Sequence, residues 1–183
     1  FLLDTALYLG CLFAPSLRWD AHTERRNDLM TKVLGSMNRH WAENKAMDWA
    51  SERTLWLTKG WSVGNYGLEL SPWKLDPCLA RTELTFLRTA LGIGETCAAE
   101  AIYWLTGLLP PIYRTWLQGI RFWSRLASSN YNSLESSALR TQWLLWQHCG
   151  TTTDIRIWIG GFLDVLNTVD WCTMDMRISL EQL

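Results

Sequence analysis

The sequence lacks the patterns that would mark a disulfide framework, a zinc module or a membrane protein. Its five cysteines are an odd number, lie far apart and form no Cys-x-x-Cys pair, which argues against a disulfide-stapled fold and a structural zinc site. No apolar run approaches the roughly 18 residues that a membrane-crossing helix needs. We therefore expect no metal site, no membrane partner and an intracellular location, nuclear or cytoplasmic.

Familiar catalytic motifs are also missing. The chain contains no Gly-x-Ser-x-Gly nucleophile elbow, no His-Glu-x-x-His helix and no Gly-rich phosphate loop followed by Lys-Ser/Thr. Adjacent aspartates, which could hold a pair of divalent metal ions, occur nowhere. Fixed-period repeats are absent too, which excludes a solenoid. These absences predict a chain without catalytic residues and without a cofactor of its own.

The chain does contain enough apolar sequence for a folded core. It has 183 residues, of which 48% are hydrophobic, and 13 tryptophans, far above ordinary usage. Because Trp side chains are large and amphipathic, we expect most of them at helix contacts and some on a surface that faces a partner. The chain begins at Phe1 rather than at methionine, which suggests a fragment or a processed piece.

The charge is nearly balanced but unevenly distributed. The formal net charge is −1, whereas a nucleic-acid-binding domain is usually clearly basic. Residues 1–125 hold 14 Lys and Arg against 12 Asp and Glu, and residues 126–183 hold 3 against 6. Any contact with a polyanion is therefore expected in the first two-thirds of the chain.

The stretch from Thr82 to Leu126 predicts three consecutive helices joined by short turns, because helix stops and starts punctuate it. These are stops at Gly92 and Gly94, a start at Thr96, a stop at Gly107 and a start at Pro110-Pro111. The flanking sequence adds further elements. Residues 6–19 favour a β-hairpin that turns at Ala14-Pro15-Ser16, and helices are expected to begin at Asp20, near Lys45, at Asp76 and at Ser133.

Apolar spacing gives each of these helices a side that faces a core. The expected core positions are Met30, Val33, Leu34, Met37 and Trp41; Trp49 and Trp56, with Gly60 for close approach; Leu79, Ala80, Leu84, Leu87 and Leu91; Ile112, Trp116, Leu117, Ile120 and Trp123; and Leu139, Trp143, Leu144 and Trp146. Residues 155–159 are compatible with either strand or helix. The predicted fold is mostly α, a helical bundle or array with a short N-terminal β-hairpin.

Basic side chains recur on the opposite sides of the same helices. On the helix from Asp20, Lys32 and Arg39 share one side with Arg25, because all three are spaced by seven residues. The helix from Asp76 carries Arg81 and Arg88 on its outer side, and the helix from Pro111 carries Arg114, Gln118, Arg121 and Arg125. Such stripes either follow a nucleic-acid backbone or form an ordinary solvated surface.

Three short patches of the sequence occur in the same order as similar patches in a known protein family. They are Tyr8-Leu9-Gly10 with Trp19 and His22; Asn65-Tyr66-Gly67-Leu68-Glu69; and a run from Arg88-Thr-Ala-Leu-Gly-Ile through Gly107-Leu-Leu-Pro to Arg121-Phe-Trp-Ser-Arg-Leu. Over roughly residues 6–126 the chain therefore resembles the thumb and following helical region of LINE-type (non-LTR) retrotransposon reverse transcriptases. One departure stands before Tyr-Leu-Gly, where the family often has Lys and this chain has Thr5-Ala6-Leu7.

This resemblance implies three segments: a hairpin with thumb-like helices over 1–70, a post-polymerase helical region over 71–130 and a C-terminal helical segment over 131–183. In the family the hairpin is the primer grip. The catalytic aspartates and their Mg²⁺ belong to the palm, which would precede Phe1, so no cofactor is expected in this chain.

The function that the resemblance implies is non-catalytic. This part of an RNA-directed DNA polymerase would position the RNA/DNA template–primer duplex through weak backbone contacts that do not read sequence. The residues expected to make these contacts are Tyr8, Leu9, Gly10, Lys32, Arg39, Arg81, Arg88, Arg114, Arg121 and Arg125. The alternative is a Trp-rich helical module that docks another protein and has no nucleic-acid role, and the near-zero net charge favours it.

Overall fold

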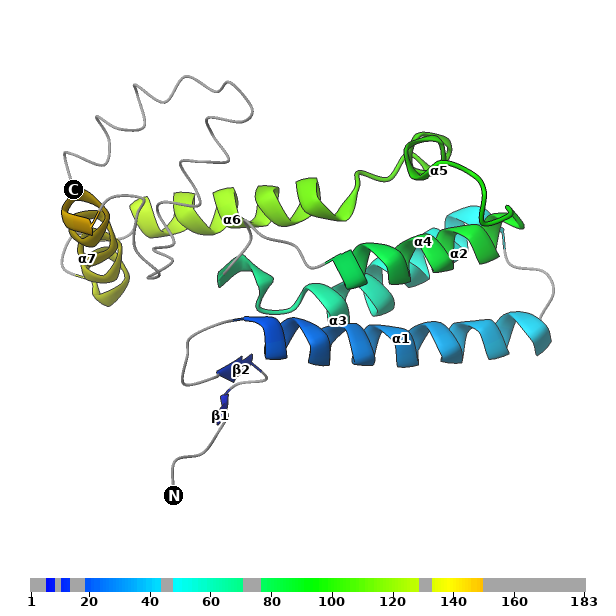
Figure 1. Ribbon diagram of the computed structural model, residues 1–183, viewed down its shortest axis with the longest axis horizontal. Helices are drawn as coiled ribbons and strands as arrows, with labels where there is room; N and C mark the ends of the chain where they lie inside the picture. The colour runs from blue at the N-terminus through cyan, green and yellow to red at the C-terminus, as the bar shows by residue number, and fades with distance from the viewer. Residues whose placement is uncertain are drawn as a thin grey trace. The chain divides into compact units, whose positions relative to one another are not determined.

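The computed structural model describes residues 6–8, 11–13, 19–43, 48–70, 77–128 and 133–149. These ranges are mostly helical, with one small antiparallel sheet (Figure 1), as the sequence predicts. The elements are β1 (Ala6–Tyr8), β2 (Cys11–Phe13), α1 (Asp20–Glu43), α2 (Trp49–Leu55), the π-helix η1 (Trp56–Trp61), α3 (Ser62–Asn65), the 3₁₀ turn η2 (Leu68–Leu70), α4 (Pro77–Leu91), α5 (Ala99–Thr106), α6 (Pro111–Ala127) and α7 (Leu134–Cys149).

Residue contacts divide the chain into two compact units. The first unit consists of Phe1–Leu68 and Lys74–Arg114, and the second of Glu69–Trp73 and Thr115–Leu183. The three-segment division at residues 70 and 130 stays a prediction. None of the helices in the described ranges is long and apolar enough to cross a membrane.

The N-terminal hairpin is present, but its turn lies earlier than the sequence indicates. Strand β1 pairs with β2 in antiparallel register, with Ala6 opposite Phe13 and Tyr8 opposite Cys11. Both strands therefore come from the first apolar run, so the expected pairing of two strands around Ala14-Pro15-Ser16 is wrong. Residues 14–16 themselves lie outside the described residues. Two residues separate the paired Tyr8 and Cys11, and hairpins are most often joined by two residues.

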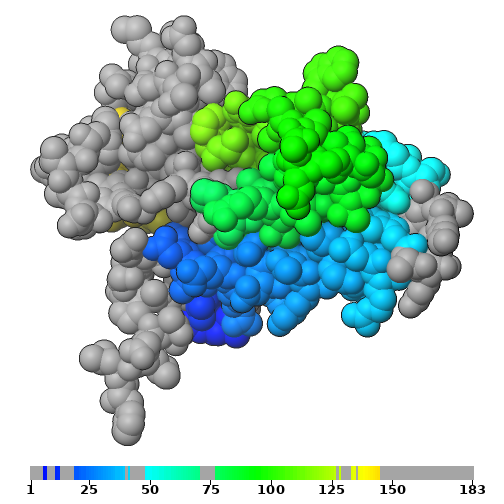
Figure 2. Space-filling model, turned by 45° about the vertical axis from the view of Figure 1, so that its right-hand side comes forward, coloured from blue at the N-terminus to red at the C-terminus, as the bar shows by residue number. Residues whose placement is uncertain are grey.

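The core of the first unit lies where α1 packs against α4 and the helices between them. Met30 and Leu34 of α1 are buried together with Leu79 and Leu87 of α4, and Figure 2 shows the green surface that includes α4 lying against the blue surface of α1. Phe86, which the apolar spacing did not single out, is fully buried at the centre of a tryptophan cluster. Its ring stacks on Trp56 at a centroid distance of 4.2 Å and also neighbours Trp41 and Trp49.

The segment after Lys45 is helical but not regular, because six residues from Trp56 form a π-helix between α2 and α3. The Trp56 ring lies directly over Gly60, where an added Cβ would stand 2.4 Å from a ring carbon. Gly60 thus allows the close approach expected from the sequence. The wider π turn, which periodicity at 3.6 residues does not anticipate, occurs where this large ring lies across its own helix.

The predicted helix starts hold for α1, α6 and α7. For α5 the predicted start is wrong, whereas its predicted end at Gly107 is confirmed. The Ser133 Oγ accepts a hydrogen bond from the Ser136 N–H at 3.1 Å, which is the expected cap of α7. Helix α5 begins at Ala99 and not at Thr96, because the Cys97 N–H bonds back to the Gly94 carbonyl in a turn and Ala98 is extended. Asp76 lies outside the described residues.

Of the remaining positions predicted to lie in the core, some are buried and some are exposed. In α6 and α7, Trp123, Leu139 and Trp143 are buried as expected, whereas Leu117 and Leu144 are exposed. The side chain of Trp146 and residues 155–159 lie outside the described part of the chain.

Candidate nucleic-acid interface

Helix α1 presents one basic side to solvent. Arg25, Lys32 and Arg39 are all exposed, and they lie opposite the buried methionines and leucine of the same helix. Asp28 is exposed as well and lies four residues before Lys32, a spacing at which carboxylate and ammonium groups attract each other. The basic side of α1 therefore carries three positive charges, partly offset by a neighbouring carboxylate.

The two arginines predicted on α4 have different surroundings. Arg81 is exposed. Arg88 is half-buried, and its Nη2 donates a hydrogen bond to the Cys97 carbonyl at 3.1 Å. Arg88 thus ties the end of α4 to the connection that leads into α5, which leaves less of its guanidinium for a phosphate.

Arg114 does not lie on an exposed stripe, so that placement is wrong. Its guanidinium pairs with the carboxylate of Glu83 on α4 and stacks over the Trp61 ring, 3.9 Å from the centroid. Glu83 is fully buried, and its second oxygen accepts a hydrogen bond from the Trp56 indole N–H at 3.2 Å. These partners cover Arg114 in the first turn of α6, which the spacing of residues along α6 alone does not reveal.

The environment of Glu83 accounts for the pKa shifts nearby. Burial raises the pKa of Glu83, while the Arg114 guanidinium and the Trp56 N–H oppose that rise. Burial also raises the pKa of the Tyr103 hydroxyl, and the neighbouring Glu83 carboxylate adds to the effect. Because both Glu83 oxygens are engaged and no solvent reaches them, we assign the cluster a structural role and not a catalytic one.

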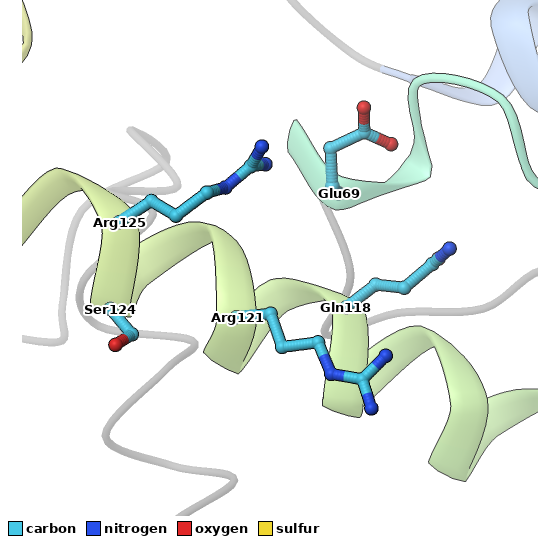
Figure 3. Close-up of a pocket in the computed structure, with 5 residues that line it drawn as sticks. All are labelled: Glu69, Gln118, Arg121, Ser124 and Arg125. Atoms are coloured by element: carbon cyan, nitrogen blue, oxygen red, sulfur yellow. The ribbon is translucent and has the colours of Figure 1, made fainter.

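Further along α6, in the second unit, polar side chains surround an open hollow of about 580 Å³. The hollow is lined by Glu69, Gln118, Arg121, Ser124 and Arg125 (Figure 3). Arg125 and Gln118 extend toward Glu69, whereas Arg121 extends away from it. Both arginines are exposed, and within the described residues no carboxylate lies at ion-pair distance from either. The arginine pair is therefore available to an anion.

Hydrogen bonds of His22, at the start of α1, connect the hairpin with the rest of the first unit. Its Nδ1 accepts a hydrogen bond from the Leu12 N–H at 3.0 Å, and its Nε2 lies 3.0 Å from the Tyr66 carbonyl oxygen. These two contacts are satisfied together by the neutral ring protonated at Nε2. His22 is fully buried, and Arg26 stacks over the Tyr66 ring at 4.6 Å.

Gly67 completes this junction. Its φ of +82° is the left-handed region that glycine adopts freely. An added Cβ would stand 2.8 Å from the Cys11 sulfur and 3.0 Å from His22 Nε2. The sequence names both His22 and Gly67 within separate patches, but only the fold reveals that they touch.

The remaining predicted positions give no side-chain geometry. Tyr8 lies in β1, but its side chain is not described, and Leu9 and Gly10 lie outside the described residues. In the described part of the chain, no three His, Cys, Asp or Glu side chains come together as metal ligands.

Comparison with protein-family models, with curated proteins and with solved structures finds no match to this chain.

Proposed function

We propose that this chain is a non-catalytic helical part of a non-LTR retrotransposon reverse transcriptase, and that it holds the template–primer duplex by its phosphate backbone. The observation that carries the proposal is the exposed arginine pair of α6, Arg121 and Arg125, beside Gln118 and Ser124 in one hollow. Two guanidinium groups with an amide and a hydroxyl are donors suited to phosphate oxygens. Positioning a duplex this way requires no base contact and no catalytic group.

The His22 junction supports the same family. Two of the three resembling patches, which lie more than forty residues apart, are joined by the hydrogen bond between His22 Nε2 and the Tyr66 carbonyl. A primer-grip hairpin must be held firmly against the thumb if it is to position a strand end, and this junction supplies such an attachment. The Mg²⁺-binding aspartates of the polymerase would belong to a palm that this chain does not contain, so no chemical step is assigned to its own residues.

The basic residues fall into two groups. Lys32, Arg39 and Arg81, together with the α6 pair, are exposed and are retained as phosphate contacts. Arg88 and Arg114 are engaged with a backbone carbonyl and with Glu83, so we assign them to the fold.

The test is the salt dependence of duplex binding, measured by fluorescence anisotropy with a labelled RNA–DNA hybrid. Each phosphate neutralised contributes about −0.9 to the slope of log affinity against log salt concentration on a DNA duplex. Replacing Arg121 and Arg125 together by Gln should therefore reduce the slope by about two units, for every duplex sequence alike. Circular dichroism should show unchanged helicity, because both side chains are exposed.

A matched control removes the same charge elsewhere. Lys59→Gln with Arg140→Gln deletes two positive charges outside the proposed contacts and should leave the slope nearly unchanged. Equal effects of the two double variants, or no binding at low salt, would reject the duplex-binding function.

A further inference from the structure

The outer side of α5 is apolar and faces solvent. Its inner side, formed by Ile102, Tyr103 and Thr106, is buried, and the helix packs against α4 on the side away from α1 (Figure 1). On the opposite side Trp104 is 83% exposed and Leu105 is 59% exposed. Among the Trp side chains that the structure describes, Trp104 alone is exposed; the others are buried or half-buried.

Further apolar side chains are exposed beyond the end of α5. Leu109 in the connection and Tyr113 in the first turn of α6 are about half exposed. Ala101, exposed one turn before Trp104 and Leu105, leaves space beside these larger side chains. These five residues, Ala101, Trp104, Leu105, Leu109 and Tyr113, are called the α5 patch. Exposed apolar side chains gathered within a short segment, with an aromatic anchor among them, are typical of protein-binding sites.

The exposed charges near the α5 patch indicate the charge that its partner should carry. Between Arg88 and Arg114 the sequence contains no Lys and no Arg, and its only charged residues are Glu95 and Glu100, both exposed. Glu100 lies one turn before Trp104 on the same side of α5. The nearby Arg88 and Arg114 are half-buried and engaged with the Cys97 carbonyl and with Glu83. The exposed charges of this segment are therefore negative, and they would attract a partner with basic residues beside its apolar contacts.

We propose that the α5 patch docks an amphipathic helix of another protein, whose apolar side is bordered by Lys and Arg. The large exposed side chains of Trp104 and Leu105 beside the small Ala101 suit the ridges-into-grooves packing of a second helix. Trp104 is the anchor, and Glu95 and Glu100 face the basic border. This surface lies in the first unit, is separate from the arginine pair of α6, and does not depend on the duplex-binding function.

The test begins with a display library of helical peptides about five turns long, with randomised contact and border positions. The full chain is the target, and the Trp104→Ser variant serves for counter-selection. Enriched peptides should carry apolar residues at i, i+3, i+4 and i+7 with Lys or Arg beside them. Failure to enrich any sequence, or enrichment of acidic borders, overturns the proposal.

Affinities of one enriched peptide, labelled for anisotropy, then test the residues. Trp104→Ser should weaken binding by about tenfold or more, and Glu100→Lys should weaken it further in low salt than in high salt. Leu134→Ser, which changes a side chain of equal exposure on α7, is the matched control and should have no effect. If Trp104→Ser and Leu134→Ser behave alike, the α5 patch is not the binding site.

Two further measurements exclude other occupants. Sedimentation equilibrium should show no self-association that Trp104→Ser abolishes, since such a result would make a second copy of the chain the occupant. A labelled single-stranded oligonucleotide should bind the chain and its Trp104→Ser variant equally, because a loss on substitution would mean that Trp104 stacks on bases. Either contrary result overturns the proposal.

Discussion

Helix α6 carries two arginines, Arg114 and Arg121, on one side, and one of them is covered by other parts of the chain whereas the other is exposed. Arg114, in the first turn, pairs with a fully buried carboxylate and stacks on Trp61. Arg121, seven residues later and on the same side of the helix, is exposed beside an open hollow. Helical periodicity determines which side chains share a side, but another part of the chain determines how much of that side is covered.

Other pairs of identical residues also differ in how far neighbouring atoms cover them. Trp56 is fully buried against Phe86, whereas Trp104 is exposed. Gly67 and Gly107 both have left-handed backbone conformations, but an added Cβ would meet neighbours only at Gly67. Whether a residue is covered therefore predicts how the molecule responds to its substitution, and the following experiments measure that difference.

The largest effect is expected at the buried ion pair. Glu83→Leu should lower the free energy of unfolding by about 3–5 kcal/mol, because it leaves the largely buried Arg114 charge without its partner. Arg121→Leu, on the exposed part of α6, should change it by less than about 0.5 kcal/mol. Urea unfolding followed by circular dichroism measures both.

A double variant separates loss of the pair from loss of packing. Glu83→Leu combined with Arg114→Leu removes both charges and should restore most of the lost stability, because apolar replacements of a buried ion pair are often neutral. If the double variant is as unstable as the sum of the two single ones, the pair is not the cause.

These residues also indicate how far the sequence could predict the fold. The buried sides of α1 and α4 followed from apolar spacing, and the starts of α1, α6 and α7 from their caps and proline. Glu83 could not be predicted as buried, because a carboxylate on an amphipathic helix ordinarily belongs to the solvated side. Only the approach of Arg114 and the Trp56 indole, from segments 31 and 27 residues away, offsets the cost of its burial.

The candidate site was predictable to a similar degree. Exposure of Lys32, Arg39, Arg81, Arg121 and Arg125 followed from their position opposite apolar stripes. The junction of Leu12, His22 and Tyr66 did not, because it depends on hydrogen bonds between backbone groups and a side chain that are far apart in sequence. No sequence signal distinguishes a histidine in such a junction from one on a surface.

A smaller effect is expected from the two glycines with left-handed backbones. Gly107→Ala, with no atom within 4 Å of the added Cβ, should cost only the conformational penalty of about 1–2 kcal/mol. Gly67→Ala carries the same penalty and must also displace Cys11 and His22, so we expect about 2–4 kcal/mol in total. Thermal and urea unfolding of the two variants would measure the difference. Equal losses of unfolding free energy would mean that Cys11 and His22 move aside at no measurable cost.

The smallest effects concern pH, where two carboxylates in opposite surroundings should respond in opposite directions. Asp48 caps α2 in solvent and accepts a hydrogen bond from the Ser51 N–H at 2.7 Å. This bond lowers the pKa of Asp48 below its ordinary value of 3.8. The folded state therefore releases that proton more readily than the unfolded chain, so the stabilisation is present above pH 3.8 and is lost as pH falls through the lowered pKa.

For Glu83 the sign reverses, because burial raises its pKa above the ordinary 4.5. The folded state holds that proton more tightly than the unfolded chain, so stability should fall as pH rises from 4.5 through the raised pKa. Urea midpoints across pH for the parent chain, Asp48→Ala and Glu83→Gln separate the two groups. The deficit of Asp48→Ala should vanish in acid, and the advantage of the parent chain over Glu83→Gln should shrink as pH rises above 4.5. A parent advantage that instead grows with pH would mean that the Arg114 charge outweighs burial and that the pKa of Glu83 is lowered.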